Sequence, residues 1–376
     1  MNSIFPPAIA ALLSPKLSDF PTEEYSGLEW RYGKIVLRPA MFKTEGLILG
    51  ALLLYYLFSF VSSTLKARKA SAWVEAHQNL YNSQFSRPGT PDTVLADGPT
   101  DYFLFSTGRR TVAYLHTIIA FWPSHDLVQV VYETVNSIID LSYSPKDTVT
   151  LDFQLSGPPS PGFVFGIISK LHMKNLRKER FDLMYFTKSS TNTALPAAVT
   201  LMSESADISD LILKSTAGTA LLAKIADPVV GKYLRSLIIS DQPTERPTKG
   251  PIPADKRHTQ VTLSLDLPPS SNLAVTESLV RAVFDLIDFL DGKLSIREDI
   301  VRKLSNTRQA LDVQLTKEVT ETSTEEKEEA EEAKRAAKRK LEEEKFAGLT
   351  PEQQKKARDG HSTPFWDLKL ISSLVA

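Results

Sequence analysis

The six histidines of this 376-residue chain are scattered, and no pair of them has the spacing of metal ligands. The chain contains no cysteine, which excludes disulfide bonds and thiol catalysis. It also lacks the GxSxG, HExxH, P-loop and GxGxxG patterns that position nucleophiles, zinc or phosphate groups. We therefore predict a protein without catalytic residues, cofactor or metal site. A membrane-tethered enzyme with an unfamiliar site is the weaker alternative.

Clustered basic side chains are the pattern that best indicates a binding partner, because such runs attract the phosphates of anionic lipid or RNA. One cluster, predicted to contact a membrane surface or RNA, consists of Lys170, Lys174, Arg177, Lys178 and Arg180. A second, predicted to contact the ribosome, consists of Lys334, Arg335, Lys338, Arg339 and Lys340. A third consists of Lys355, Lys356 and Arg358. The alternative for each cluster is a solvated helix face without a partner.

One apolar stretch, Gly46 to Leu65, is long enough to cross a membrane. Its 20 residues carry no charge, and Leu54 and Tyr55 lie near its middle. A helix of that length spans roughly 30 Å, the thickness of the hydrocarbon core of a bilayer. A buried core helix is the alternative, but core helices normally have a polar face and this stretch has none. The sequence therefore predicts a single-pass membrane protein.

The charges that flank the span leave its orientation open. Four basic residues lie in the 15 positions before the span, namely Arg31, Lys34, Arg38 and Lys43. Three follow it closely, namely Lys66, Arg68 and Lys69. Because the counts are nearly equal, the positive-inside rule favours a cytosolic C-terminal side only slightly.

Residues 66–94 predict a juxtamembrane helix and a linker, and residues 95–292 predict a mixed α+β domain. Two strands joined by a turn at Gly108-Arg109 are predicted from 101 to 122, and further strands are predicted at 148–155 and 259–267. The segments FDLMYF and AVTLMSE predict another strand pair.

Helical spacing of apolar residues recurs between and after these strands. Ser124 or Asp126 is expected to cap a helix whose apolar face contains Val128, Val131, Val135 and Ile138. The other predicted helices are a basic helix ending near residue 180, two helices at 205–215 and 217–238, and a strongly periodic helix from Asn272 to Leu290.

A long charged helix is predicted at 293–346, and it begins at the capping box Ser295-x-x-Glu298. Its apolar stripe ends near Val319, and residues 317–345 carry 11 acidic and 8 basic side chains. A coiled coil needs sustained apolar a and d positions, so we expect a solvated single helix with a coiled-coil-like composition. Residues 347–376 form a C-terminal tail whose last 12 residues are largely apolar.

A series of four residues follows the span: Trp73, and then His77, Leu80 and Phe85 at four, seven and twelve residues after Trp73. This series and the order of the elements resemble the calumin-like, coiled-coil-domain-containing proteins of the endoplasmic reticulum membrane. Those proteins are a subunit of the PAT complex, which assists insertion of multi-pass membrane proteins. The resemblance covers residues 46–345 in layout and is specific mainly over 66–85 and at the Gly108-Arg109 turn.

The resemblance implies a non-enzymatic adaptor and chaperone, with residues 1–45 in the lumen and the large domain in the cytosol. The domain would lie beside the Sec translocation channel, and the charged helix would reach toward ribosomal RNA. The span would pair with a small membrane protein resembling Asterix, and together they would shield nascent multi-pass proteins. The animal relatives have a long acidic lumenal region linked to calcium, whereas residues 1–45 here hold five acidic and five basic residues.

Two alternatives for the function remain open at this point. The first is a membrane-tethered lipid-binding or lipid-transfer domain that uses the basic helix at 170–180 against anionic headgroups. The second is a calcium-homeostasis factor of the endoplasmic reticulum.

Overall fold

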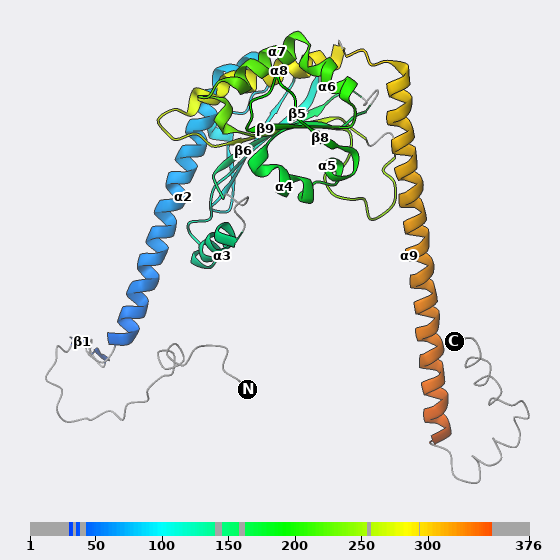
Figure 1. The fold of residues 1–376 in the computed structure, drawn as a ribbon. Helices are drawn as coiled ribbons and strands as arrows, with labels where there is room; N and C mark the ends of the chain where they lie inside the picture. Colours follow the sequence, from blue (N-terminus) through cyan, green and yellow to red (C-terminus); the bar gives the residue numbers. More distant parts are fainter. Residues whose placement is uncertain are drawn as a thin grey trace, which may run out of the picture. The chain divides into compact units, whose positions relative to one another are not determined.

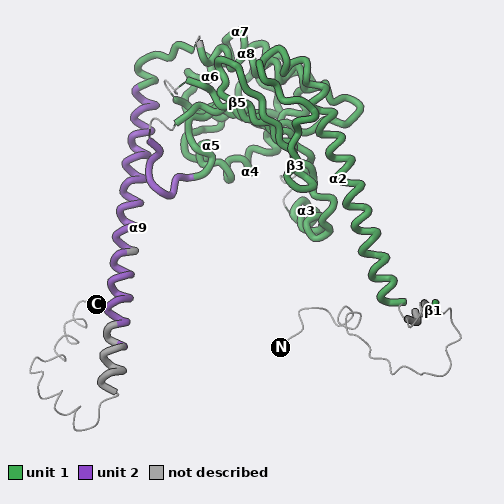
Figure 2. The backbone as a smooth tube through the Cα atoms, turned by 180° about the vertical axis from the view of Figure 1, so that it is seen from behind, with its two compact units in different colours: residues 1–245, 257–301 green, residues 246–256, 302–376 purple. Residues whose placement is uncertain are grey.

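The computed structural model describes residues 30–32, 35–37, 43–139, 145–157, 162–253, 257–292 and 294–347 (Figure 1). The chain forms two compact units (Figure 2). The first comprises residues 1–245 and 257–301, and the second comprises residues 246–256 and 302–376.

An antiparallel sheet of nine strands forms the centre of the first unit. In spatial order its strands are β3 (Leu95–Asp97), β4 (Asp101–Thr107), β5 (Val112–Ala120), β6 (Thr148–Leu155), β11 (Gln260–Asp266), β10 (Leu234–Ser240), β7 (Phe165–Ser169), β9 (Val199–Ser203) and β8 (Lys188–Ser190). Alternate residues of β6 are buried, as its period-two pattern predicts. A separate pair consists of β1 (Trp30–Tyr32) and β2 (Ile35–Leu37).

Helices cover both faces of the large sheet (Figure 1). One side carries α6 (Ala206–Leu213), α7 (Thr216–Ala226) and α8 (Glu277–Gly292), and the other carries α4 (Lys170–Glu179) and α5 (Phe181–Phe186). The apolar face of α8 packs on the sheet, where Phe284 lies edge-on to Phe153 with 5.3 Å between ring centroids. Short 3-10 turns occur at η2 (Pro91–Thr93), η3 (Gly231–Tyr233) and η5 (Leu273–Thr276). The mixed α+β class predicted from the sequence is confirmed.

The helix predicted to follow residue 124 or 126 is α3 (Leu127–Ile139). Asp126 is its cap, because the Asp126 carboxylate accepts the backbone N–H groups of Val128 and Gln129 at 2.9 and 3.1 Å. The Ser124 hydroxyl instead bonds to Ser62. The helix exists where the pattern places it, but its apolar face is exposed.

The strand predicted over FDLMYF is wrong, since these residues form the short helix α5. Met184 and Tyr185 are both exposed and Phe186 is buried, an arrangement that a helical turn allows and an alternating strand does not. The buried Asp182 carboxylate supports the turn, because it accepts the Leu183 N–H at 2.8 Å. The strands that pair with β9 are β7 and, on its other side, β8, which follows α5.

The helix predicted over 217–238 is too long. The α7 helix ends at Ala226, and Asp227 has extended backbone angles because it precedes Pro228. Residues 234–240 then form β10, a largely buried strand that the sequence pattern did not separate from the preceding helix. A short apolar run can belong to a buried strand or to a buried helix, and the proline is the signal that distinguishes them here.

The second unit contains most of α9 (Glu298–Ala347), whose first residues belong to the first unit. Within the second unit, Arg246 donates to both carboxylate oxygens of Glu318, at 2.6 and 2.7 Å. The apolar stripe predicted to end near Val319 includes Leu304, Leu311 and Leu315, which are buried. All side chains from 327 to 337 are exposed. The charged part of α9 is thus a solvated helix surface.

Candidate membrane interface

The α2 helix (Lys43–Gln84) runs without a break from the apolar stretch into the first unit. Among the described residues, α2 is the one helix that is long and apolar enough to cross a membrane. No side chain in that apolar window is buried. A core helix would be covered by the protein, so the exposure of this segment argues against the core-helix alternative.

The other half of α2 is buried in the first unit through Trp73, His77, Leu80 and Tyr81. The His77 ring stacks on Trp73 with 4.0 Å between centroids. The His77 Nδ1 lies 2.9 Å from the Trp73 carbonyl oxygen, and Nε2 lies 3.1 Å from the Thr276 hydroxyl. Burial lowers the pKa of His77, only partly offset by its hydrogen bond to the Trp73 carbonyl and by the charge of Glu277. His77 therefore packs inside the core as a neutral side chain, away from any surface.

The Gly108-Arg109 turn fastens the β4–β5 hairpin to both α2 and α8. Gly108 has φ +93°, and a Cβ atom there would lie 1.9 Å from the Ser86 hydroxyl oxygen. Arg109 donates to Gln84 at the end of α2 and to Asp288 of α8, the latter at 2.7 Å. The series from Trp73 to Phe85 and the Gly108-Arg109 turn therefore have the same structural role, because together they hold α2 in the domain.

A row of hydrogen bonds joins α2 to the loop Trp122–Asp126, from the middle of the apolar stretch to just beyond its end. The Tyr55 hydroxyl donates to the His125 carbonyl at 2.5 Å, and Ser62 and Ser124 bond at 2.9 Å. Lys66 Nζ donates to the Trp122 carbonyl at 2.8 Å. The sequence did not predict this contact, although the Ser62-Ser63-Thr64 run is a signal of polar partners.

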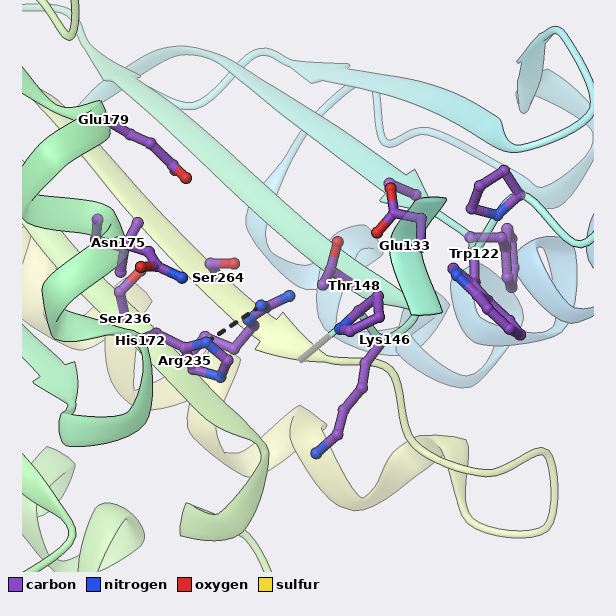
Figure 3. Close-up of a pocket in the computed structure, with 15 residues that line it drawn as sticks. Trp122, Glu133, Lys146, Thr148, His172, Asn175, Glu179, Arg235, Ser236 and Ser264 are labelled. Carbon is purple, nitrogen blue, oxygen red and sulfur yellow. Dashed lines mark hydrogen bonds between the residues drawn. The ribbon is translucent and has the colours of Figure 1, made fainter. Parts of the chain in front are cut away.

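A pocket of about 380 Å³ lies beside this loop, between α3, α4 and the sheet (Figure 3). His172 and Arg235 lie together at one end of it, and Trp122 and Glu133 lie at the other. Arg235 donates to His172 Nδ1 at 3.3 Å. Burial and, after it, the Arg235 charge lower the pKa of His172. Asp266 lies 3.5 Å from both Lys146 and Arg235, so the charge of the two bases is partly compensated.

The model of the family "PAT complex subunit CCDC47" matches residues 41–360, which include α2, the whole sheet and α9. The chain belongs to this family.

Two known proteins are similar to the chain. The UPF0674 endoplasmic reticulum membrane protein C2G5.01 of Schizosaccharomyces pombe is 28% identical over 286 residues, 71% of this chain and 73% of that protein. The PAT complex subunit CCDC47 of Danio rerio is 24% identical over 182 residues, 45% of this chain and 36% of that protein. The family and the apolar half of α2 together support an endoplasmic reticulum membrane protein with one candidate span.

The family match includes the basic helix α4, where the structure separates the predicted contact residues. Lys170, Lys174, Arg177 and Lys178 are exposed. Arg180 is mostly buried and donates to both carboxylate oxygens of Asp182, at 3.1 and 2.8 Å. Because this pairing occupies its guanidinium, Arg180 is a poor candidate for a phosphate contact, and the exposed four remain.

The second basic cluster lies in the solvated part of α9. Lys334, Arg335 and Lys340 are exposed, and Arg335 pairs with Glu331 at 3.5 Å as the i,i+4 spacing predicts. Lys338 and Arg339 lie in the same helix, but their side chains are outside the described part of the structure. The third cluster, with Lys355, Lys356 and Arg358, and the C-terminal tail also fall outside the described residues.

Proposed function

We propose that this protein is a non-enzymatic adaptor and chaperone subunit of the endoplasmic reticulum membrane that assists insertion of multi-pass membrane proteins at the Sec translocon. The observation that carries the proposal is the construction of α2. One unbroken helix has an uncovered, uncharged apolar half and a second half locked into a folded unit. Membership of the PAT complex subunit family supports the same role.

The role that we propose for each segment of the chain follows from the construction of α2. Residues 46–65 span the membrane, pair with a small membrane protein resembling Asterix, and shield partly polar client helices. Shielding has a physical basis, because an unpaired polar side chain in a bilayer costs a few kcal/mol at its centre. The domain at 95–292 faces the cytosol beside the channel, residues 66–94 join it to the span, and the helix at 293–346 reaches the ribosome.

Glycosylation mapping tests the cytosolic orientation. The chain contains no Asn-x-Ser/Thr acceptor, so one introduced site reports without background. We expect no glycosylation of a site placed in the exposed η2 loop and efficient glycosylation of a site placed near residue 15. The reverse result would contradict the proposed topology.

Sedimentation through a sucrose cushion tests the ribosome contact. Wild-type protein from gently solubilised membranes should pellet with ribosomes at low salt and be released at high salt, as expected for phosphate contacts. Charge reversal of all five residues of the α9 cluster should weaken the association, and the double variant Lys334→Glu/Arg335→Glu should show part of this loss.

The matched control is Lys303→Glu/Lys317→Glu. It makes the same change of charge at two exposed positions of the same helix outside the cluster. Equal association of the wild type and the five-residue variant would show that the helix is not the contact.

Lipid binding is the second candidate function, and the pocket beside the Trp122–Asp126 loop favours it. A volume of about 380 Å³ and a mixed polar and apolar lining suit part of a lipid molecule. The full chain should then co-purify with a phospholipid that mass spectrometry detects. Ser264→Phe, which fills the pocket, should abolish this signal, whereas absence of lipid from the wild-type protein would reject this candidate.

A further inference from the structure

We infer that α3 (Leu127–Ile139) lies in the membrane, in the leaflet nearest the folded unit, and forms a second lipid contact beside the span. The inference concerns lipid acyl chains as the occupant of its exposed face. It stands apart from the proposed role at the translocon, because it requires neither a ribosome nor a partner protein.

The first observation is that α3 is amphipathic in the opposite sense to a helix of a soluble domain. Seven large apolar side chains are exposed, with values from 47% for Val135 to 80% for Val128. They are Leu127, Val128, Val131, Tyr132, Val135, Ile138 and Ile139. At 3.6 residues per turn these seven occupy one continuous arc of about 140°.

Most polar side chains of α3 face the protein instead of water. Gln129 donates to Glu133 at 2.8 Å, and Glu133 is buried at the pocket. Asn136 and Ser137 are also partly covered. A helix whose polar face is satisfied inside and whose apolar face is outside gains stability when that outer face leaves water, at about 25 cal/mol for each Å² covered.

The second observation identifies what covers this face. The N-terminus of α3 is held against the apolar stretch of α2 by the Tyr55–His125 and Ser62–Ser124 hydrogen bonds. Tyr55 lies ten residues before Leu65, which is about 15 Å along the helix axis. Figures 1 and 2 both show α3 beside the middle part of α2. Whatever solvates the span at that level therefore also surrounds α3.

The length and charge of α3 agree with a helix that lies in a leaflet. Its 13 residues are too few to cross a bilayer. Glu133 is its one charged residue, and that side chain is buried. An uncharged outer arc can enter the acyl region without the cost of placing a charge there. Two attachments, α2 and α3, would then restrain rotation of the first unit about the axis of α2.

Single-cysteine labelling tests the inference on the full chain, which has no native cysteine. Val131→Cys and Ile138→Cys report on the outer arc, and Ala220→Cys, an exposed position of α7, is the matched water-facing control. Each variant is labelled with the fluorophore NBD and reconstituted in vesicles of phosphatidylcholine and phosphatidylserine. Quenching is then compared between acyl-chain nitroxide lipids and aqueous iodide.

We expect the two α3 positions to be quenched several-fold more strongly by nitroxide lipids than by iodide, and Ala220→Cys to show the reverse. Iodide quenching of the α3 positions at the level of the control would overturn the inference, because the arc would face water. Protection from both quenchers would also overturn it, because protein would then cover the arc.

A charge variant provides a second, independent readout. Val131→Lys/Val135→Lys should lower the lipid quenching of a label at Ile138→Cys by several-fold, since two ammonium groups resist entry into the acyl region. The control Thr219→Lys/Ala220→Lys adds two charges at exposed positions of α7, away from this arc, and should leave the quenching nearly unchanged. Equal lipid quenching in the double variant and the control would contradict the lipid contact.

Discussion

The His77 imidazole lies stacked on the Trp73 indole, with 4.0 Å between the ring centroids and 23° between their planes. A backbone carbonyl oxygen can only accept, so His77 Nδ1 donates to the Trp73 carbonyl. In the neutral ring Nε2 then accepts the proton of the Thr276 hydroxyl. This arrangement joins α2 to η5, which lies about 200 residues later in the chain, and it depends on a neutral histidine.

The stability of the folded unit should therefore fall in mild acid. Burial lowers the pKa of His77 from its ordinary value of 6.5, so below about pH 6.5 the unfolded chain binds a proton that the folded chain resists. The free energy of unfolding then decreases as the pH falls through that region. Urea denaturation of the detergent-solubilised chain, followed by circular dichroism between pH 7.5 and 5.5, measures the slope.

His77→Gln should flatten this pH dependence, since glutamine can form hydrogen bonds but does not titrate. His116→Gln is the matched comparison. Burial also lowers the pKa of His116, but this side chain is only partly buried, whereas His77 is fully buried. The same slope in wild type and His77→Gln would show that another group controls the acid sensitivity.

Gly108→Ala should destabilise the domain more than Gly98→Ala does. Both glycines have positive φ angles, and a left-handed residue other than glycine costs about 1–2 kcal/mol. Only at Gly108 would the new Cβ also meet the Ser86 side chain, since nothing lies within 4 Å of that position at Gly98. Denaturation midpoints of the two variants measure the difference, and Ser86→Ala should restore part of the loss at Gly108. Equal losses in both variants would argue against the steric contact.

Arg109 and Asp288 should be coupled energetically. Their 2.7 Å ion pair joins the β4–β5 turn to α8, and the Arg109 side chain is 10% exposed while that of Asp288 is 54% exposed. For a partly exposed pair we expect a coupling free energy of about 0.5–1 kcal/mol in a double-mutant cycle with Arg109→Ala and Asp288→Ala. Arg109→Ala alone should lower the free energy of unfolding by more than Asp288→Ala does, because it also removes the contact of the guanidinium with the Phe284 ring. Additive losses would show that the two side chains act independently.

Gly46→Leu/Gly50→Leu should weaken association of the span with its proposed small membrane partner. The two glycines lie four residues apart on one side of α2, and no described part of the chain lies within 4 Å of a Cβ atom placed on either of them. Such spacing lets helix backbones approach closely in a bilayer, and leucine side chains would prevent that approach.

Co-precipitation from gently solubilised membranes measures the association. The control Ile48→Ala/Leu52→Ala alters exposed apolar residues on the opposite side of the same helix. A larger loss in this control than in the glycine variant would place the partner on the other face.

Patterns of near neighbours in the sequence predicted the elements whose environment is uniform along their length. The alternation in β6 follows from a repeat of 2 residues and the apolar face of α8 from a repeat of 3.6 residues. The apolar half of α2 follows from 20 consecutive residues without a charge. The predictions for the short segments α5 and β10 were wrong, because a short and largely apolar segment can have the same composition in a buried strand and in a helix.

The tertiary structure alone decided which surfaces these elements meet. The sequence predicted a helix after Ser124 or Asp126 with one apolar face, but periodicity reports which side chains share a face and not whether that face turns inward. Likewise, the spacing of Trp73 and His77 marked one side of a helix, whereas the partner of His77 is Thr276, 199 residues later. Such contacts depend on chain segments that are distant in sequence, and a local pattern carries no information about them.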